Sequence, residues 1–179
     1  MNIVTVVGNP RTGSRTLAAA VAATEAVAAR LGQDCQRDVV DLSALGPVLL
    51  DARAHAGLEV ALELVRGAHL AVIASPTYKA TYTGLLKAFL DRLPPGALAG
   101  RTALPVLVMG DPRHALAVEV HFRPLLLELG ASVPTPGLAL LESDLPGGPA
   151  LAAWADLVVP QIPPVEEALR FPLGEEALR

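Results

Sequence analysis

The chain has 179 residues and a formal net charge of −4 at pH 7, and 52% of its residues are hydrophobic. This length suits one domain with a full core, and the small charge argues against a nucleic-acid binder and against an acidic electron carrier that docks by charge. The single cysteine, Cys35, excludes an intrachain disulfide and any metal or cluster site built from several cysteines.

Apolar runs typical of strands alternate along the chain with patterns typical of helices. Five strands are expected, the second weak and the fifth broken, at Ile3–Val7, Cys35–Val40, His69–Ala74, Ala103–Met109 and Ser132–Leu141. Five helices are expected, roughly at Arg15–Leu31, Leu58–Gly67, Gly84–Leu93, His114–Gly130 and Leu151–Val159. This alternation predicts an α/β fold, a three-layer α/β/α sandwich around a parallel sheet of strand order 2-1-3-4-5. One domain would span residues 1–179, with 160–179 as a peripheral tail.

The sequence predicts neither export nor membrane insertion. It begins with a strand pattern rather than with a charged segment followed by an apolar one, so no signal peptide is expected. It also has no run of about 18 uninterrupted apolar residues, the length that a membrane span needs. With one cysteine in the chain, a reducing compartment and a cytoplasmic location are expected.

The loop after the first strand carries the strongest functional signal. Ile3–Val7 is typical of a strand buried on both faces, Gly8–Ser14 is a turn rich in small and hydroxyl residues, and an alanine-rich helix starts at Arg15. A loop between a buried strand and a helix N-terminus presents free N–H groups and a partial positive charge, so it can hold a phosphate. Arg11 and Arg15 add full positive charges. No acidic residue occurs before Glu25, so no repulsion of an anion is expected there.

Two more unusual loops are expected at the same edge of the sheet. The carboxyl ends of strands 1, 3 and 4 meet where the strand order reverses, which is where such folds bind ligands. The second loop, Ser75–Gly84, contains both tyrosines of the chain, and the third is Gly110–His114. Each loop by itself is also explained as an ordinary turn. Together, cations and N–H groups for a phosphate and aromatic side chains for a flat ring predict a nucleotide-like or flavin ligand.

Four segments resemble the NADPH-dependent FMN reductases, which have a flavodoxin-like fold. They are Gly8–Thr16, Ser75–Lys87, Leu93–Leu104 and His114–Ala131, and the second is the most specific. The resemblance covers roughly residues 1–135 and is nearest to the branch that supplies two-component alkanesulfonate monooxygenases. One departure is Met109-Gly110-Asp111, which stands where that branch usually has Gly-Gly-Thr.

The resemblance implies FMN as the flavin and NADPH as the hydride donor. It implies no catalytic acid or base, because the two cofactors carry the hydride transfer themselves. Phosphate binding would fall to hydroxyls and cations of the first loop, the ring would lie against the second, and Asp111 would bring a carboxylate to the ring edge. The implied cofactor-binding residues are Asn9, Arg11, Ser14, Arg15, Thr16, Pro76, Thr77, Tyr78, Lys79, Tyr82, Gly110 and Asp111.

The resemblance also implies partners. A homo-oligomer, a dimer or a tetramer, would form through the helix that contains His121 and Pro124, which carries an irregular turn in the family. The segment Val118–Pro124 is mostly apolar with few charges, and that composition suits an interface. A flavin-dependent monooxygenase would receive the reduced flavin, whereas no nucleic acid and no membrane is expected as a partner.

Three other functions fit parts of the sequence. A flavin-bound NAD(P)H-dependent quinone, azo-dye or metal-ion reductase would share the fold and the loops. A non-enzymatic flavodoxin-type electron carrier would usually be more acidic and carry more aromatic residues in its ring loops. A P-loop nucleotidase would match the spacing from Gly8 to Gly13, but Ser14 stands where that motif needs a lysine.

Overall fold

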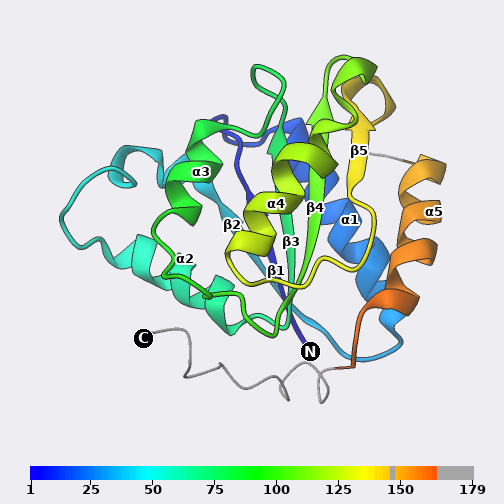
Figure 1. The fold of residues 1–179 in the computed structure, drawn as a ribbon, viewed down its shortest axis with the longest axis horizontal. Helices are drawn as coiled ribbons and strands as arrows, with labels where there is room; N and C mark the ends of the chain where they lie inside the picture. Colours follow the sequence, from blue (N-terminus) through cyan, green and yellow to red (C-terminus); the bar gives the residue numbers. More distant parts are fainter. Residues whose placement is uncertain (146–147, 165–179) are drawn as a thin grey trace.

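The computed structural model describes residues 1–145 and 148–164 of the chain. Its parallel strands form one sheet in the order β2-β1-β3-β4-β5, which confirms the predicted strand order (Figure 1). The neighbouring strands pair without exception in parallel. Their bounds are β1 (Asn2–Val7), β2 (Gln36–Asp41), β3 (Leu70–Pro76), β4 (Thr102–Met109) and β5 (Leu138–Leu141).

Helices cover both faces of the sheet, so the three-layer prediction is also confirmed (Figure 1). Helices α1 and α5 pack on one face, and α2, α3 and α4 pack on the other. Successive side chains of a strand point to opposite faces, and both faces of β1 are therefore apolar. The helix bounds are α1 (Arg15–Leu31), α2 (Ala56–Gly67), α3 (Gly84–Leu90), α4 (Arg123–Glu128) and α5 (Gly148–Val158).

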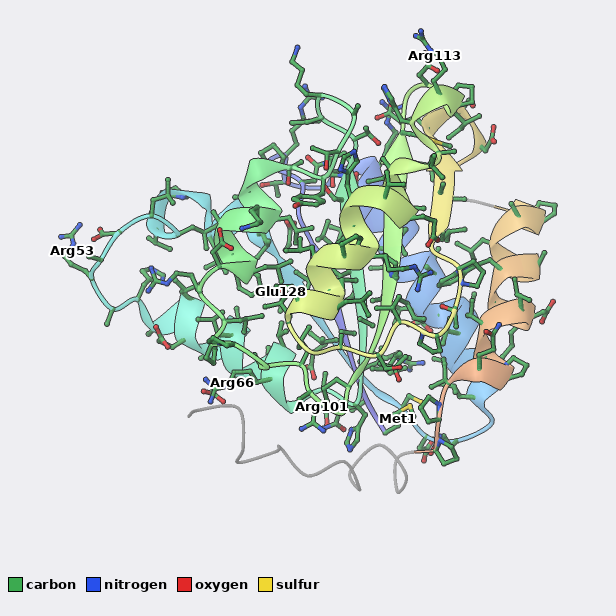
Figure 2. The ribbon with its side chains drawn as sticks, in the orientation of Figure 1. Met1, Arg53, Arg66, Arg101, Arg113 and Glu128 are labelled. Carbon is green, nitrogen blue, oxygen red and sulfur yellow. The ribbon has the colours of Figure 1, made fainter. Side chains whose placement is uncertain are left out.

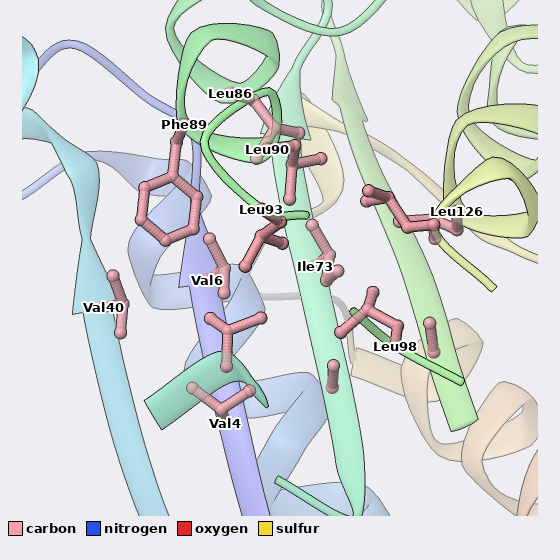
Figure 3. Packing of buried hydrophobic residues seen from close by; sticks show 14 of the residues in the cluster. Val4, Val6, Val40, Ile73, Leu86, Phe89, Leu90, Leu93, Leu98 and Leu126 are labelled. Carbon is pink, nitrogen blue, oxygen red and sulfur yellow. The ribbon is translucent and has the colours of Figure 1, made fainter. Parts of the chain in front are cut away.

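The core of the α2–α3–α4 face shows this alternation directly. Val4 and Val6 of β1 and Ile73 of β3 are buried beneath Leu90 of α3 and Leu126 of α4 (Figure 3). All five side chains are at most 1% exposed. Burying each such side chain contributes about 1.5–3 kcal/mol, so the strands whose ends carry the loops are held firmly in place.

Helix α1 begins and ends as its sequence predicts. The Ser14 side chain accepts a hydrogen bond from the Leu17 N–H group, and Gly32 ends the helix in the left-handed conformation. Small alanine side chains let the helix approach the sheet closely. The buried hydroxyls of Thr24 in α1 and Thr5 in β1 hydrogen-bond to each other across that contact at 2.6 Å.

The segment predicted as one helix at His114–Gly130 is divided into three short helical pieces, and it contains an irregular turn of the kind that the resemblance implies. A 3₁₀ turn at Pro112–His114 and a π-helical turn at Val118–Phe122 precede the short helix α4. Pro124 explains the break, because it has no N–H group and its ring collides with the carbonyl four residues earlier in a regular helix. The wider π turn places Pro124 in the first turn of α4, where a proline is tolerated.

The last predicted strand is also shorter than expected. Ser132 makes only an isolated bridge with Thr102, and the ladder proper starts at Leu138. Pro134 and Pro136 lie between them, and prolines cannot donate to a ladder. Of the predicted tail, the described residues contain a 3₁₀ turn at Val159–Gln161 and end at residue 164; the rest of that prediction lies outside them. Within the described ranges, no helix combines the length and the apolar character needed to cross a bilayer.

Candidate functional site

The three predicted loops meet at one edge of the sheet, beyond the carboxyl ends of β1, β3 and β4 (Figure 1). Figure 2 marks this edge by Arg113, at the top, while Met1 and Arg101 mark the opposite edge. The strand order reverses between β1 and β3, so the predicted location of the site agrees with the topology.

Hydrogen bonds tie the three loops to one another. The Gly8 N–H group donates to the Ala74 carbonyl at 2.8 Å, and the Thr77 N–H group donates to the Val108 carbonyl at 2.7 Å. The buried hydroxyl of Thr83 donates to the Gly8 carbonyl at 2.6 Å and also accepts the Leu86 N–H group, which caps α3. These hydrogen bonds hold the first two loops against each other and against the start of α3.

Asn9 and Thr16 shape the first loop from inside. Both are buried, and the Asn9 Nδ2 atom donates to the Thr16 Oγ1 atom at 3.0 Å. The Asn9 Oδ1 atom accepts the Arg11 N–H group at 3.0 Å, which forms a tight turn. These two predicted ligand residues thus hold the loop in shape.

The loop leaves a row of backbone donors free. The N–H groups of residues 12–16 donate to no acceptor in the described part of the chain. They border a cavity of about 430 Å³ at the N-terminus of α1, a position that favours an anion. The cavity is lined by Asn9, Arg11, Thr12, Gly13, Ser14, Arg15, Thr16, Pro76, Tyr78 and Glu142. This donor set fits a phosphate.

The charge around the cavity differs from the expectation in one respect. Arg11 is exposed, and no carboxylate of the described residues lies within ion-pairing distance of it. Arg15, however, pairs with Glu142, whose Oε2 atom lies 2.7 Å from the Arg15 Nη2 atom. The expectation of an anion site free of nearby acidic residues was wrong, because the fold brings in Glu142 from the end of β5.

Tyr78 enters the cavity lining from a strained hairpin. Tyr78 and Thr81 pair with each other, and the two residues between them, Lys79 and Ala80, have φ angles of 53° and 66°. Two non-glycine residues in this left-handed region are unusual. Tyr78 is 43% exposed and belongs to the cavity lining, so its side chain is accessible to a ligand. Lys79 lies at the hairpin tip and not in the lining.

Thr77 and Tyr82 do not belong to the lining of the cavity. The Thr77 hydroxyl donates to the Val108 carbonyl at 3.2 Å, so it supports the loop. The Tyr82 ring packs on the Phe122 ring, with the ring centres 5.6 Å apart. Tyr82 thereby connects the second loop to the π turn below it.

Asp111 has a partner in its own loop. Its carboxylate binds the Arg113 guanidinium at 2.6 Å and accepts the Arg113 N–H group at 2.9 Å. These hydrogen bonds lower the pKa of Asp111 to about 2, so it is ionised at neutral pH. Neither Asp111 nor its neighbour Gly110 belongs to the cavity lining. The charge of the Asp111 carboxylate is therefore compensated by Arg113, and its expected place at the ring edge stays a prediction.

A second cavity, of about 400 Å³, lies at the opposite edge of the sheet, near Asn2 and Gln36. Its charged lining residues are acidic, namely Asp38, Glu59 and Glu63. An acidic lining repels phosphate, so the cavity at the N-terminus of α1 is the better candidate for the ligand suggested by the sequence.

The roles of two residues at the site, Glu142 and Thr83, are not predicted from the sequence. Glu142 is 127 residues from Arg15, and no local pattern connects them. Thr83 immediately precedes the helix that starts at Gly84, which is a recognisable capping position. Its hydrogen bond to Gly8 depends on the packing of β3 beside β1 and has no sequence signal.

Comparison with known proteins adds an independent line of evidence. Residues 1–144 match the family model described as NADPH-dependent FMN reductase. An FMN reductase (NADPH) of Pseudomonas aeruginosa is 34% identical over 148 residues, 79% of this chain and 77% of the relative. The NADH-dependent FMN reductase SfnF of Pseudomonas putida is 34% identical over 128 residues, 70% of this chain and 69% of the relative. The apo structure of an NADH:FMN oxidoreductase, EMOB, is 34% identical with a TM-score of 0.81 and covers 90% of this chain and 87% of its own. The chain thus belongs to the NADPH-dependent FMN reductase family.

Proposed function

We propose that this protein is an NADPH-dependent FMN reductase that binds FMN with its phosphate in the first loop. The observation that carries the proposal is the row of free N–H groups at residues 12–16, which borders one cavity together with two arginines and Tyr78. Backbone donors and guanidinium groups suit a phosphate, and an aromatic face suits a flat ring. The matched family and its relatives support the same ligand.

The residues of the chain would bind and orient the reactants. Arg11, Arg15 and the loop N–H groups would hold the phosphate, while Pro76 and Tyr78 would flank the ring. Bound FMN supplies the hydride acceptor, so the reaction requires no acid or base from the protein. Holding two flat rings at contact distance and excluding water lowers the barrier by positioning alone.

Stopped-flow kinetics tests the proposal. Oxidation of NADPH and of NADH is followed with free FMN, FAD, riboflavin and a quinone as acceptors. We expect rapid reduction of FMN, with NADPH the better donor. The choice of NADPH follows the matched family, although some relatives are named NADH-dependent. The opposite outcome would be rapid reduction of the quinone, with no acceleration by added flavin and no exchange of added flavin with bound flavin. That result would identify a flavin-bound quinone reductase.

Arg15→Ala is expected to weaken FMN binding by about 1.5 kcal/mol, roughly tenfold in Kd, because one charged hydrogen bond to the phosphate is lost. The effect stays near the lower end of the usual range because Arg15 is exposed and Arg11 remains. Riboflavin lacks the phosphate and should bind the variant almost as it binds the wild type. Fluorescence titration measures both constants, and an equal loss for both flavins would argue against the phosphate assignment.

We also propose that the protein assembles through the segment that contains the π turn. Leu116, Val120 and Leu127 are 66%, 51% and 52% exposed, and Pro124 between them is exposed too. Their spacing of three to four residues places them along one side of the helical segment. Such an apolar stripe on an outer helix suits contact with a second copy, as a dimer or a tetramer.

Val120→Glu should therefore shift the protein to a smaller assembly, because a charge in an apolar interface is left without a partner. Light scattering coupled to size-exclusion chromatography measures the mass. Val60→Glu is the matched control, since Val60 is 60% exposed on α2, away from the stripe. A wild-type protein that is monomeric at every concentration tested would refute the assembly.

The remaining partners follow from the proposed reaction. We propose that the protein works in the cytoplasm and delivers reduced FMN to a flavin-dependent monooxygenase. Co-purification of a monooxygenase with the tagged protein from its native cells, and faster turnover of that monooxygenase when the reductase is added, test this role.

A further inference from the structure

We infer that Glu142 sets how weakly the first loop holds FMN, by competing with the flavin phosphate for Arg15. This inference rests on the proposed function and assigns a role to a residue that binds no flavin itself. Glu142 follows directly after β5 and starts the 3₁₀ turn Glu142–Asp144. Arg15 starts α1. Their side chains meet at the cavity with 2.7 Å between Oε2 and Nη2.

The position of Glu142 in the cavity is unusual. Among the described residues that line this cavity, Glu142 is the one carboxylate. Apart from Gly13 and Pro76, the other lining residues offer cations, hydroxyls, an amide or an aromatic ring. Other exposed arginines also pair with carboxylates, such as Arg37 with Glu25. That pair lies outside the lining of the phosphate cavity, so it does not face an incoming phosphate.

The strength of the ion pair suits competition. The Arg15 side chain is 66% exposed and the Glu142 side chain 40%, and ion pairs this exposed to solvent are weak. A phosphate dianion can therefore displace Glu142 from Arg15. The displaced carboxylate still borders the cavity, so it repels the bound phosphate. Both effects weaken FMN binding and leave riboflavin binding untouched.

Weak binding suits the proposed function. A reductase that passes its reduced flavin to another protein must release it at each turnover, so excess affinity would slow the cycle. Glu142 would supply this release through the phosphate alone, without altering the surroundings of the ring.

The test is the variant Glu142→Gln, which removes the charge and keeps the size. We expect the Kd for FMN to fall about fivefold to tenfold, the amount expected from losing one competing charge, with a slower FMN dissociation rate. The Kd for riboflavin should not change. Glu25→Gln is the matched control, because it removes the same charge from an exposed pair outside the cavity, and it should alter neither constant. Thermal unfolding verifies that both variants are folded.

The variant Glu142→Gln in the Arg15→Ala background separates competition for Arg15 from simple charge repulsion between Glu142 and the phosphate. We expect the tightening to shrink in this background because the contested guanidinium is absent. An unchanged or weaker FMN affinity in Glu142→Gln, or an equal tightening in both backgrounds, would overturn the inference. Failure of the proposed function has a different signature: wild-type protein that binds neither flavin, or that holds FMN no more tightly than riboflavin.

Discussion

Gly8→Ala is expected to lower the free energy of unfolding by about 2–3 kcal/mol, the usual upper range for overpacking. A Cβ atom at Gly8 would lie 2.6 Å from the Leu86 Cβ atom and 3.3 Å from two further atoms of that side chain. The Leu86 Cβ atom is fixed to the backbone of α3, so relief requires movement of the helix or of the loop. Urea unfolding followed by circular dichroism measures the loss.

The same substitution should weaken FMN binding by more than tenfold, roughly 1.4 kcal/mol or more. The Gly8 carbonyl accepts the Thr83 hydroxyl, so moving Gly8 displaces both loops that meet at the cavity. Gly67→Ala is the control, because nothing lies within 4 Å of a Cβ atom at that position. Inside a helix, alanine is more stabilising than glycine by about 0.5–1 kcal/mol. Gly8→Ala protein with wild-type stability and affinity would show that the contact between β1 and α3 is not as tight as described.

Arg123→Ala is expected to cost about 2–3 kcal/mol of stability, the range for charged hydrogen bonds left unpaired in a partly buried site. The Arg123 guanidinium donates to Glu119 at 2.6 Å and to the carbonyls of Val133 and Thr135. Glu119 in turn accepts the Gly137 N–H group at 2.7 Å. One side chain thus holds the π turn and the segment before β5 together.

The loss at Arg123 should depend on pH in a defined direction. Its hydrogen bond to Glu119 lowers the pKa of that carboxyl below the ordinary 4.5. The stabilisation is therefore complete above about pH 4.5 and disappears as the pH falls through the lower pKa of the folded state. Urea unfolding at about pH 7 and about pH 3 should show a smaller difference between wild type and variant in acid. Arg53→Ala is the control, since Arg53 is 89% exposed, and it should leave the stability nearly unchanged.

The fold and the position of the site could be predicted because both follow from local patterns. The apolar run at Ile3–Val7, the turn after it and the helix at Arg15 each have a signature in consecutive residues, and the strand order follows from connection rules. The resemblance further suggested which loops to expect at the cavity. Seven of the predicted cofactor-binding residues line the cavity, and their contact with a cofactor stays a prediction: Asn9, Arg11, Ser14, Arg15, Thr16, Pro76 and Tyr78.

The remaining features depend on packing between distant segments. Glu142 reaches Arg15 because β5 ends at the same edge of the sheet at which α1 begins. Tyr82 packs on Phe122 because α3 and the π turn cover the same face of the sheet. Pro124 indicates that the fourth helix is interrupted, but a proline alone does not determine whether a helix kinks, stops or forms a π turn. Only the tertiary contacts decide among these outcomes.

The hairpin at Lys79 and Ala80 has a consequence for engineering. Each non-glycine residue held at a positive φ angle retains roughly 1–2 kcal/mol of conformational energy. An Asn-Gly tip would release much of it without altering any residue of the cavity lining. A more heat-resistant biocatalyst could therefore be obtained by changing the hairpin tip alone. Selection for turnover would not favour this change, because it leaves the cavity as it is.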